Sequence, residues 1–186
     1  MADEPLETGL IGGVEKREIR IVGYDTDWPK KFETHSRIIA DALGGSALRI
    51  EHIGSTSVPG LAAKPIIDIL VVVPDSADES TYLPQLEAAG YGLRVREPDW
   101  YEHRMFRTPE KDVHLHIYSV GCEEIELVLT FRDRLRRNSD DRSRYEQVKR
   151  ELAAKEWSDM NAYADAKTEV IKSIIAASQA AGEISQ

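Results

Sequence analysis

Residues 51–73, EHIGSTSVPGLAAKPIIDILVVV, place one carboxylate, Asp68, within a run of Ile, Leu and Val. Burying an unpaired carboxylate is costly, so an acid in such a strand is expected to have a partner. Gly54 and Ser55 end the preceding strand, in a turn whose backbone N–H groups can hold a phosphate. A phosphate-sized turn beside a strand-borne acid indicates a site for a nucleotide and a metal ion. The alternative is that Asp68 only caps a neighbouring turn.

The same stretch resembles known proteins. Ile53, Gly54 and Ser55, followed by Asp68 on an apolar strand, are similar to the hydrophobic-Gly-Ser and Asp-x-Asp signature of the nucleotidyltransferase superfamily. More narrowly, residues 51–69 resemble the GrpB family, and the likeness extends over about residues 22–175. Further positions matching GrpB signatures are Phe131, Arg132, Asp133, Leu135, Arg136, Tyr145, Lys149, Tyr163 and Lys167.

The resemblance implies a metal-dependent nucleotidyl- or phosphotransferase that acts on a small molecule. Asp68 would be the catalytic residue and the principal ligand of Mg²⁺ or Mn²⁺, which binds phosphates and orients them for in-line attack. Active nucleotidyltransferases usually carry a second acid two residues later, where this chain has Leu70. The missing ligand could be supplied by Glu51, His114, His116 or another group. Two alternatives remain open: a non-catalytic module that binds a nucleotide or phosphorylated metabolite, and a scaffold for a protein partner.

Further candidate ligands for phosphate surround this stretch. Ser55 and Thr56 add hydroxyl donors to the Gly54 turn. Lys64 precedes Pro65, which holds it in an extended conformation before the acidic strand. A lysine there could reach a phosphate, or could simply be a solvated loop residue. His52 lies on the first strand and is a further candidate for the pocket.

Other candidates come from the later part of the chain. His114 and His116 are two residues apart, so they share one face of a strand and could bind a metal or a phosphate. Arg132 and Arg136 share one face of a helix, which could bind phosphate or form surface ion pairs. The family resemblance favours a role for both arginines and for Lys167. We expect His52, Ser55, Lys64, Asp68, His114, His116 and Arg132 to converge on one pocket.

Composition limits the remaining functions. The chain has 186 residues, 41% of them hydrophobic and 31% charged, and a net charge of −9. The negative charge argues against nonspecific nucleic-acid binding but allows a local basic pocket. One cysteine, Cys122, excludes an internal disulfide and a cysteine-based zinc site. No apolar run is long enough to span a membrane and no signal peptide is evident, so we expect a cytoplasmic protein without a membrane partner.

The pattern of elements predicts a flexible tail over residues 1–18 and a single domain over residues 19–186. We expect an α/β (α+β) fold with a nucleotidyltransferase-like mixed sheet and flanking N- and C-terminal helices. The expected strands are residues 47–53, 66–73, 91–95, 101–107 and 113–119. The first expected helix begins near Pro29 and is stopped by Gly44 and Gly45. The further expected helices cover residues 78–89, 123–136, 140–154 and 159–177, with Ser158 or Asp159 capping the last.

Overall fold

A six-stranded mixed sheet forms the centre of the computed structural model, which describes residues 9–15, 18–157 and 160–182. The strand order is β1-β4-β5-β6-β3-β2. Only the β3–β6 pair is parallel among the strands described; the other four pairs are antiparallel. The strands are β1 (Gly9–Leu10), β2 (Arg49–Ile53), β3 (Ile67–Val73), β4 (Gly92–Glu97), β5 (His103–Arg107) and β6 (Val113–Ser119).

The apolar strand β3 occupies an interior position because both its faces are covered. Ile67, Ile69 and Val71 belong to one core cluster, whereas Leu70 and Val72 belong to another on the opposite face. This double burial explains why the strand lacks the alternation of a half-exposed strand. The predicted α/β class and mixed sheet are therefore confirmed.

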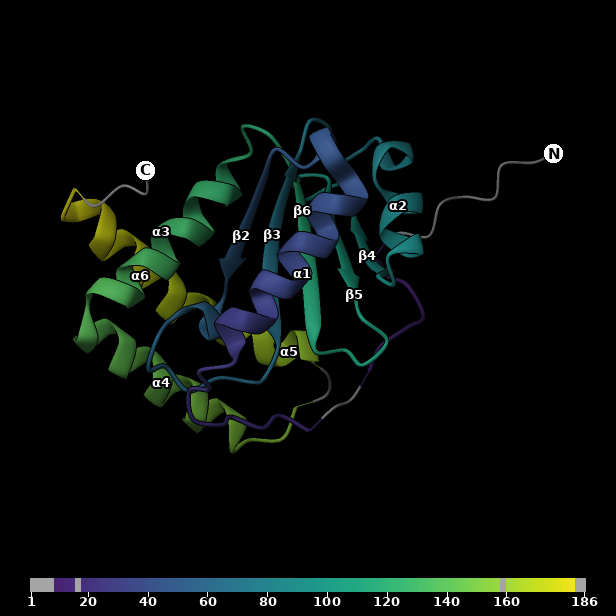
Figure 1. The fold of residues 1–186 in the computed structure, drawn as a ribbon. Coiled ribbons are helices and arrows are strands. Elements are labelled where there is room, and N and C mark those ends of the chain that lie inside the picture. The colour runs from purple at the N-terminus through teal and green to yellow at the C-terminus, as the bar shows by residue number, and fades with distance from the viewer. Residues whose placement is uncertain (1–8, 16–17, 158–159, 183–186) are drawn as a thin grey trace.

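Helices cover the two faces of the sheet unequally (Figure 1). α1 (Trp28–Leu43) and α2 (Leu83–Ala88) pack on one face, where Ile39 and Leu86 are fully buried. On the other face, α3 (Glu123–Arg137) packs Ile125 and Leu129 against β2 and β3. α4 (Ser139–Ala153) and α6 (Thr168–Ala180) pack against α3, while α5 (Met160–Asp165) reaches the end of the sheet where Asp68 lies. Over β4, β5 and β6, this face has two hollows, both lined by Val95, Met105 and His116.

Two predicted helices differ from the structure. The single helix predicted over residues 159–177 is wrong, because the chain turns at residues 166–167 between α5 and α6. Lys167, in this break, places its ammonium group 4.6 Å from the centre of the Tyr163 ring. The helix predicted over residues 78–89 is a 3-10 turn, η3 (Glu79–Thr81), followed by the short α2. The predicted caps Ser158 and Asp159 lie outside the described residues.

Part of the segment predicted as a flexible tail contacts the sheet. β1 pairs with the edge strand β4, and Arg94 donates hydrogen bonds to the carbonyl oxygens of Ile11 and Gly13. Glu15 forms ion pairs with Arg107 and Lys111, both at 2.8 Å. Residues 1–8 and 16–17 of the predicted tail lie outside the described residues. Within the described part of the chain, none of the helices has the length and apolar character needed to cross a membrane.

Candidate functional site

A cavity of about 340 Å³ opens where β3 and β6 begin and β2 ends. Its walls come from both core strands, from the turn after β2 and from the C-terminal helices. Eight of the residues predicted from the sequence line it: Gly54, Ser55, Thr56, Lys64, Asp68, His114, His116 and Lys167. The convergence expected for the central part of the site is therefore present.

Gly54 brings the turn directly against the carboxylate of Asp68. Its backbone has φ +70° and ψ −174°, a conformation that is essentially restricted to glycine. A Cβ atom at this position would stand 2.7 Å from Asp68 Oδ2, closer than any ordinary contact. The glycine is thus needed for both its conformation and its lack of a side chain. The short 3-10 helix η2 (Ser55–Ser57) begins directly after it, and the first N–H groups of such a turn have no partner within the helix.

Asp68, His114 and His116 gather their donor atoms within 4.8 Å of one another. The parallel register pairs Asp68 with His114 and Leu70 with His116, so the three polar side chains share one face of two adjacent strands. Asp68 Oδ1 lies 3.3 Å from His116 Nε2 and 3.7 Å from His114 Nδ1. One carboxylate and two imidazoles form a donor set that suits a divalent transition-metal ion.

Electrostatics keep this group ready to bind a cation. Burial alone would raise the pKa of Asp68, but the hydrogen bond with His116 and the nearby positive charges outweigh it and lower this pKa. Burial lowers the pKa of His114 to about 4, against the opposing attraction of Asp68. At neutral pH the site therefore offers a charged carboxylate and a neutral imidazole at His114, the forms that bind metals.

Three lysines line the opposite part of the cavity. Lys64 and Lys167 lie over the Tyr163 ring, 4.9 Å and 4.6 Å from its centre. Lys149 is 2% exposed and donates a hydrogen bond to the carbonyl oxygen of Ala62. Burial, together with the charge of neighbouring lysines, lowers the pKa of Lys149 to about 7 and that of Lys167 to about 8. Crowded positive charge of this kind favours an anionic ligand.

Two buried polar atoms of the cavity walls have no hydrogen-bond partner. Within the described residues, these are His114 Nε2 and the hydroxyl oxygen of Tyr163. Buried polar groups in folded proteins are almost always paired, and exceptions commonly mark a site for a ligand, ion or water. Both atoms belong to the same cavity, so the orphaned groups coincide with the charged ones.

The hydroxyl groups near the turn are already engaged within the protein. Thr56 donates its hydroxyl proton to the carbonyl oxygen of Ile66 at 3.0 Å and contacts His52 Nε2 at 3.0 Å. His52 stacks on Phe32 with ring centres 4.8 Å apart, and burial lowers its pKa to about 4. Burial raises the pKa of Tyr145, and a hydrogen bond with Ser55 partly offsets this rise. These contacts fix the turn but do not point His52 into the cavity.

Two predicted arginines also lie elsewhere. Arg132 forms ion pairs with Glu51 at 2.8 Å and with Asp133 at 2.7 Å, and Arg136 donates to the carbonyl oxygen of Ser57 at 2.8 Å. Together with His52 they line a separate hollow of about 280 Å³. The expectation that His52 and Arg132 converge with Asp68 is thus wrong. α3 places Arg132 and Arg136 against the outer side of the turn, where they contact Glu51 and Ser57.

Leu70, at the position of the missing acid, is fully buried in the cluster beneath α3 with Val72 and Leu129. Glu51 is occupied by Arg132 and Arg49. Of the replacement ligands considered from the sequence, the structure therefore brings only the two histidines to Asp68.

Sequence reasoning about the site missed Lys149 as a cavity residue, and also Tyr163, Phe131 and Val128. Lys149 stands among charged residues of α4, a pattern typical of a solvated helix face. The signal that could have found it is Tyr145, four residues earlier, since residues at this spacing share a helix face and Tyr145 is buried.

Known proteins are similar to this chain along most of its length. Residues 18–177 match the GrpB protein family. A UPF0157 protein of Halalkalibacterium halodurans is 51% identical over 175 residues, which cover 93% of this chain and 90% of that protein. A UPF0157 protein of Streptomyces coelicolor is 53% identical and covers 89% of this chain and 87% of its own.

A solved structure agrees with this assignment. The crystal structure of the conserved protein GrpB from Enterococcus faecalis is similar with a TM-score of 0.75 and 34% sequence identity. The match covers 84% of this chain and 95% of that one. The chain therefore belongs to the GrpB family.

Proposed function

We propose that this protein is a metal-dependent nucleotidyl- or phosphotransferase acting on a small molecule. The observation that carries the proposal is the meeting of the Asp68, His114 and His116 cluster with three buried or half-buried lysines in one cavity. A site for a cation beside a site for an anion is what a metal–triphosphate complex requires. The cytoplasm, where we expect this protein, supplies such complexes.

The residues have distinct roles in this proposal. Asp68, His114 and His116 hold a divalent ion, which polarises the phosphate oxygens and offsets their charge. Of the two ions expected from the sequence, Mn²⁺ suits imidazole nitrogen better than Mg²⁺ does, because Mg²⁺ prefers oxygen ligands. Lys64, Lys149 and Lys167 neutralise the phosphate chain, and the turn after Gly54 donates backbone N–H groups to it. Gly54 leaves the space beside the turn that the Asp68 carboxylate occupies.

The positions of Lys149, which is buried, and Lys167, which is half-buried, support an anionic ligand in particular. Their lowered pKa values mean that burial and neighbouring positive charge make the ammonium form of each lysine less favourable than in water. A phosphate chain would raise both pKa values again, so we expect proton uptake, mainly by Lys149, to accompany its binding at neutral pH. A merely structural lysine gains nothing from such an anion.

A non-catalytic binding module is the second candidate. It is favoured by one observation, the replacement of the second acid by Leu70 in a closed apolar cluster. Under this alternative the cavity binds the nucleotide or phosphorylated metabolite but transfers nothing. A scaffold role, the third reading of the sequence, needs neither a metal nor a nucleotide.

Incubation of the purified protein with each nucleoside triphosphate and Mn²⁺ or Mg²⁺ distinguishes these candidates. Nucleotidyl transfer to an acceptor hydroxyl releases pyrophosphate, whereas phosphoryl transfer releases the nucleoside diphosphate. We expect one of these products, in a metal-dependent reaction that Asp68→Asn abolishes and the exposed control Asp75→Asn leaves unchanged. Metal-dependent stabilisation by a triphosphate without either product, across a panel of acceptors, supports the binding module. No stabilisation by any triphosphate contradicts the transferase and a module that binds nucleotides.

A further inference from the structure

A row of hydrogen-bonding side chains leads from Asp68 across the sheet. His116 Nε2 lies 3.3 Å from Asp68 Oδ1, and His116 Nδ1 lies 3.2 Å from His103 Nε2. His103 Nδ1 in turn lies 2.6 Å from Glu97 Oε2. The four residues come from four adjacent strands, β3, β6, β5 and β4, and each contact joins neighbouring strands.

Packing holds the middle of this row rigidly. His103 is 6% exposed and lies directly opposite Glu97 in the β4–β5 pair. Its ring stacks on Tyr118, with ring centres 4.8 Å apart, and on His116, with ring centres 5.4 Å apart. Trp100 packs edge-on against the same ring at 5.3 Å. His116 is less enclosed, since 24% of its side chain is exposed against 7% for His103. The contact with His103 therefore restricts its orientation.

The direction of the hydrogen bonds decides which nitrogen of His116 can bind a cation. If His103 donates Nδ1–H to the Glu97 carboxylate, its Nε2 is free to accept a hydrogen bond. His116 then donates Nδ1–H to His103, and its Nε2 carries a lone pair that can bind an ion lying between it and Asp68. Such an ion takes the place of the hydrogen bond between His116 and Asp68. A metal-ligating histidine commonly has its second nitrogen bound in this way, which fixes both the tautomer and the ring orientation.

We propose that Glu97 and His103 are positioning residues that hold His116 with Nε2 available to a divalent metal ion beside Asp68. The proposal rests on the metal site of the proposed function and extends it to two residues that touch neither metal nor substrate. Because the pair acts through an imidazole, it favours an ion that accepts nitrogen, such as Co²⁺, Zn²⁺ or Mn²⁺, over Mg²⁺.

The test measures Co²⁺ affinity by the visible absorption of the bound ion, in the full chain without nucleotide. His103→Phe keeps the stacked ring but removes both nitrogens, and we expect it to weaken Co²⁺ binding by about 10- to 100-fold. His103→Gln, whose side-chain amide can replace Nε2, should recover part of that loss. Glu97→Gln, which keeps an acceptor oxygen but loses the charge, should have a smaller effect than His103→Phe. The matched control is His35→Gln, which removes a histidine of α1 whose Nδ1 lies 2.6 Å from the Tyr91 hydroxyl.

A second readout separates positioning from a general loss of structure. In Zn²⁺-loaded wild type, ¹H–¹⁵N spectra of the imidazole should place the His116 proton on Nδ1, and thermal unfolding without metal confirms that each variant is folded. Equal Co²⁺ affinity of wild type, His103→Phe and Glu97→Gln would overturn the positioning role while leaving the proposed function intact. A His116 proton on Nε2 in the Zn²⁺-loaded protein would also overturn it. Absence of Co²⁺, Zn²⁺ and Mn²⁺ binding to the wild type would overturn this proposal together with the metal site on which it rests.

Discussion

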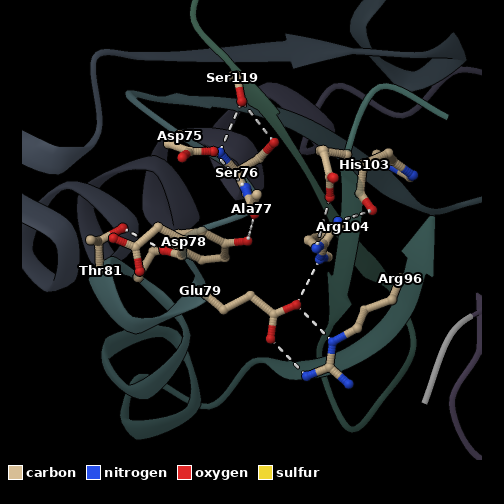
Figure 2. Close-up of polar contacts among 12 residues, drawn as sticks. Asp75, Ser76, Ala77, Asp78, Glu79, Thr81, Arg96, His103, Arg104 and Ser119 are labelled. Carbon is tan, nitrogen blue, oxygen red and sulfur yellow. Dashed lines mark hydrogen bonds and ion pairs between the residues drawn. The ribbon is translucent and has the colours of Figure 1, made fainter. Parts of the chain in front are cut away.

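Two clusters of charge lie on opposite faces of the same sheet and are satisfied to different degrees. Figure 2 shows the first, in which the Glu79 carboxylate lies between Arg96 and Arg104. Glu79 accepts hydrogen bonds from Arg96 Nε and Nη2, each at 2.7 Å, and from Arg104 Nε at 2.6 Å. Arg104 also pairs with Glu102 at 3.1 Å. The charges of this cluster balance, and its contacts are short.

The cavity around Asp68 differs in both respects. Asp68 meets its histidines at 3.3 Å and 3.7 Å, and three lysines share the cavity with this single carboxylate. His114 Nε2 and the Tyr163 hydroxyl have no partner there. His103 and Arg104 are adjacent on β5 and point to opposite faces of the sheet, so His103 contacts His116 and Arg104 contacts Glu79. Saturated charge on one face indicates a structural role, and unsatisfied charge on the other indicates a binding site.

Leu70→Asp should have the largest effect on stability, because it places an acid where no cation can reach it. Leu70 is fully buried beneath α3, so we expect the substitution to cost about 4 kcal/mol of unfolding free energy. It should not strengthen Mn²⁺ binding, whereas an acid at residue 70 that faced the cavity would be expected to do so. Denaturant unfolding and Mn²⁺ titration check both statements, with Leu70→Asn separating charge from shape. A stable variant with tighter Mn²⁺ binding would show that residue 70 reaches the cavity.

Glu79→Gln should be next, because it leaves two arginines in the saturated cluster without their shared carboxylate. We expect a loss of about 3 kcal/mol in unfolding free energy. Glu33→Gln, which breaks the exposed contact with Arg37 at 3.9 Å, should change stability by no more than about 0.5 kcal/mol. Metal and triphosphate affinities of folded Glu79→Gln should equal those of the wild type. Weaker ligand binding at unchanged stability would reverse the roles assigned to the two clusters.

Gly54→Ala should damage the cavity more than the fold. The added Cβ meets the Asp68 carboxylate, and the glycine-only backbone adds strain of about 2 kcal/mol. Gly60→Ala is the matched control, since Gly60 has a similar φ of +78° but a methyl group added there would meet nothing within 4 Å. Both variants should lose stability, but only Gly54→Ala should lose Mn²⁺ affinity. Equal Mn²⁺ affinity in the two variants would mean that the close approach to Asp68 has no bearing on binding.

The pH dependence of stability should reveal the crowded lysines. Because Lys149 has a pKa of about 7 in the folded chain, well below its ordinary value, the unfolded state binds more protons between about pH 7 and pH 10. The unfolding free energy of the ligand-free protein should therefore rise with pH across this range. Charged or titratable groups that influence Lys149 are Lys64, Tyr145, Glu146, Arg150 and Lys167.

Lys149→Met should reduce the slope of this rise, and the exposed control Lys155→Met should leave it unchanged. Chemical denaturation at several pH values from 7 to 10 provides the measurement. If Lys149→Met and wild type have the same slope, Lys149 has its ordinary pKa in the folded protein, which contradicts the effect of burial and neighbouring lysines argued for this cavity.

The sequence was most informative where local pattern and function coincide. The unbroken apolar character of β3 predicted a doubly covered strand, and a lone acid within it predicted Asp68 as the centre of the cavity. The spacing of His114 and His116 predicted a shared face, but the parallel register that places them beside Asp68 depends on tertiary pairing. Long-range register of this kind is not encoded in any short motif.

The wrong placements have a similar cause. Arg132 and His52 have the right chemistry for phosphate, but the rotation of α3 and the stacking of His52 on Phe32 direct them to the outer side of the turn. Glu97 and His103 gave no signal because their contacts lie across the consecutive strand pairs β4–β5 and β5–β6, whose register no short pattern specifies. The break at residues 166–167 was hidden by continuous helix-forming residues.

Calorimetric titration of Mn²⁺ and a nucleoside triphosphate into wild type and Asp68→Asn tests the central claim most directly. Asparagine keeps the shape of the side chain but removes the charge that holds a hard cation. We predict that the wild type binds Mn²⁺ weakly alone and more tightly with the triphosphate, and that Asp68→Asn remains folded but loses the metal-dependent binding. Asp68→Asn that binds Mn²⁺ and triphosphate like the wild type would contradict the account and remove Asp68 from the site.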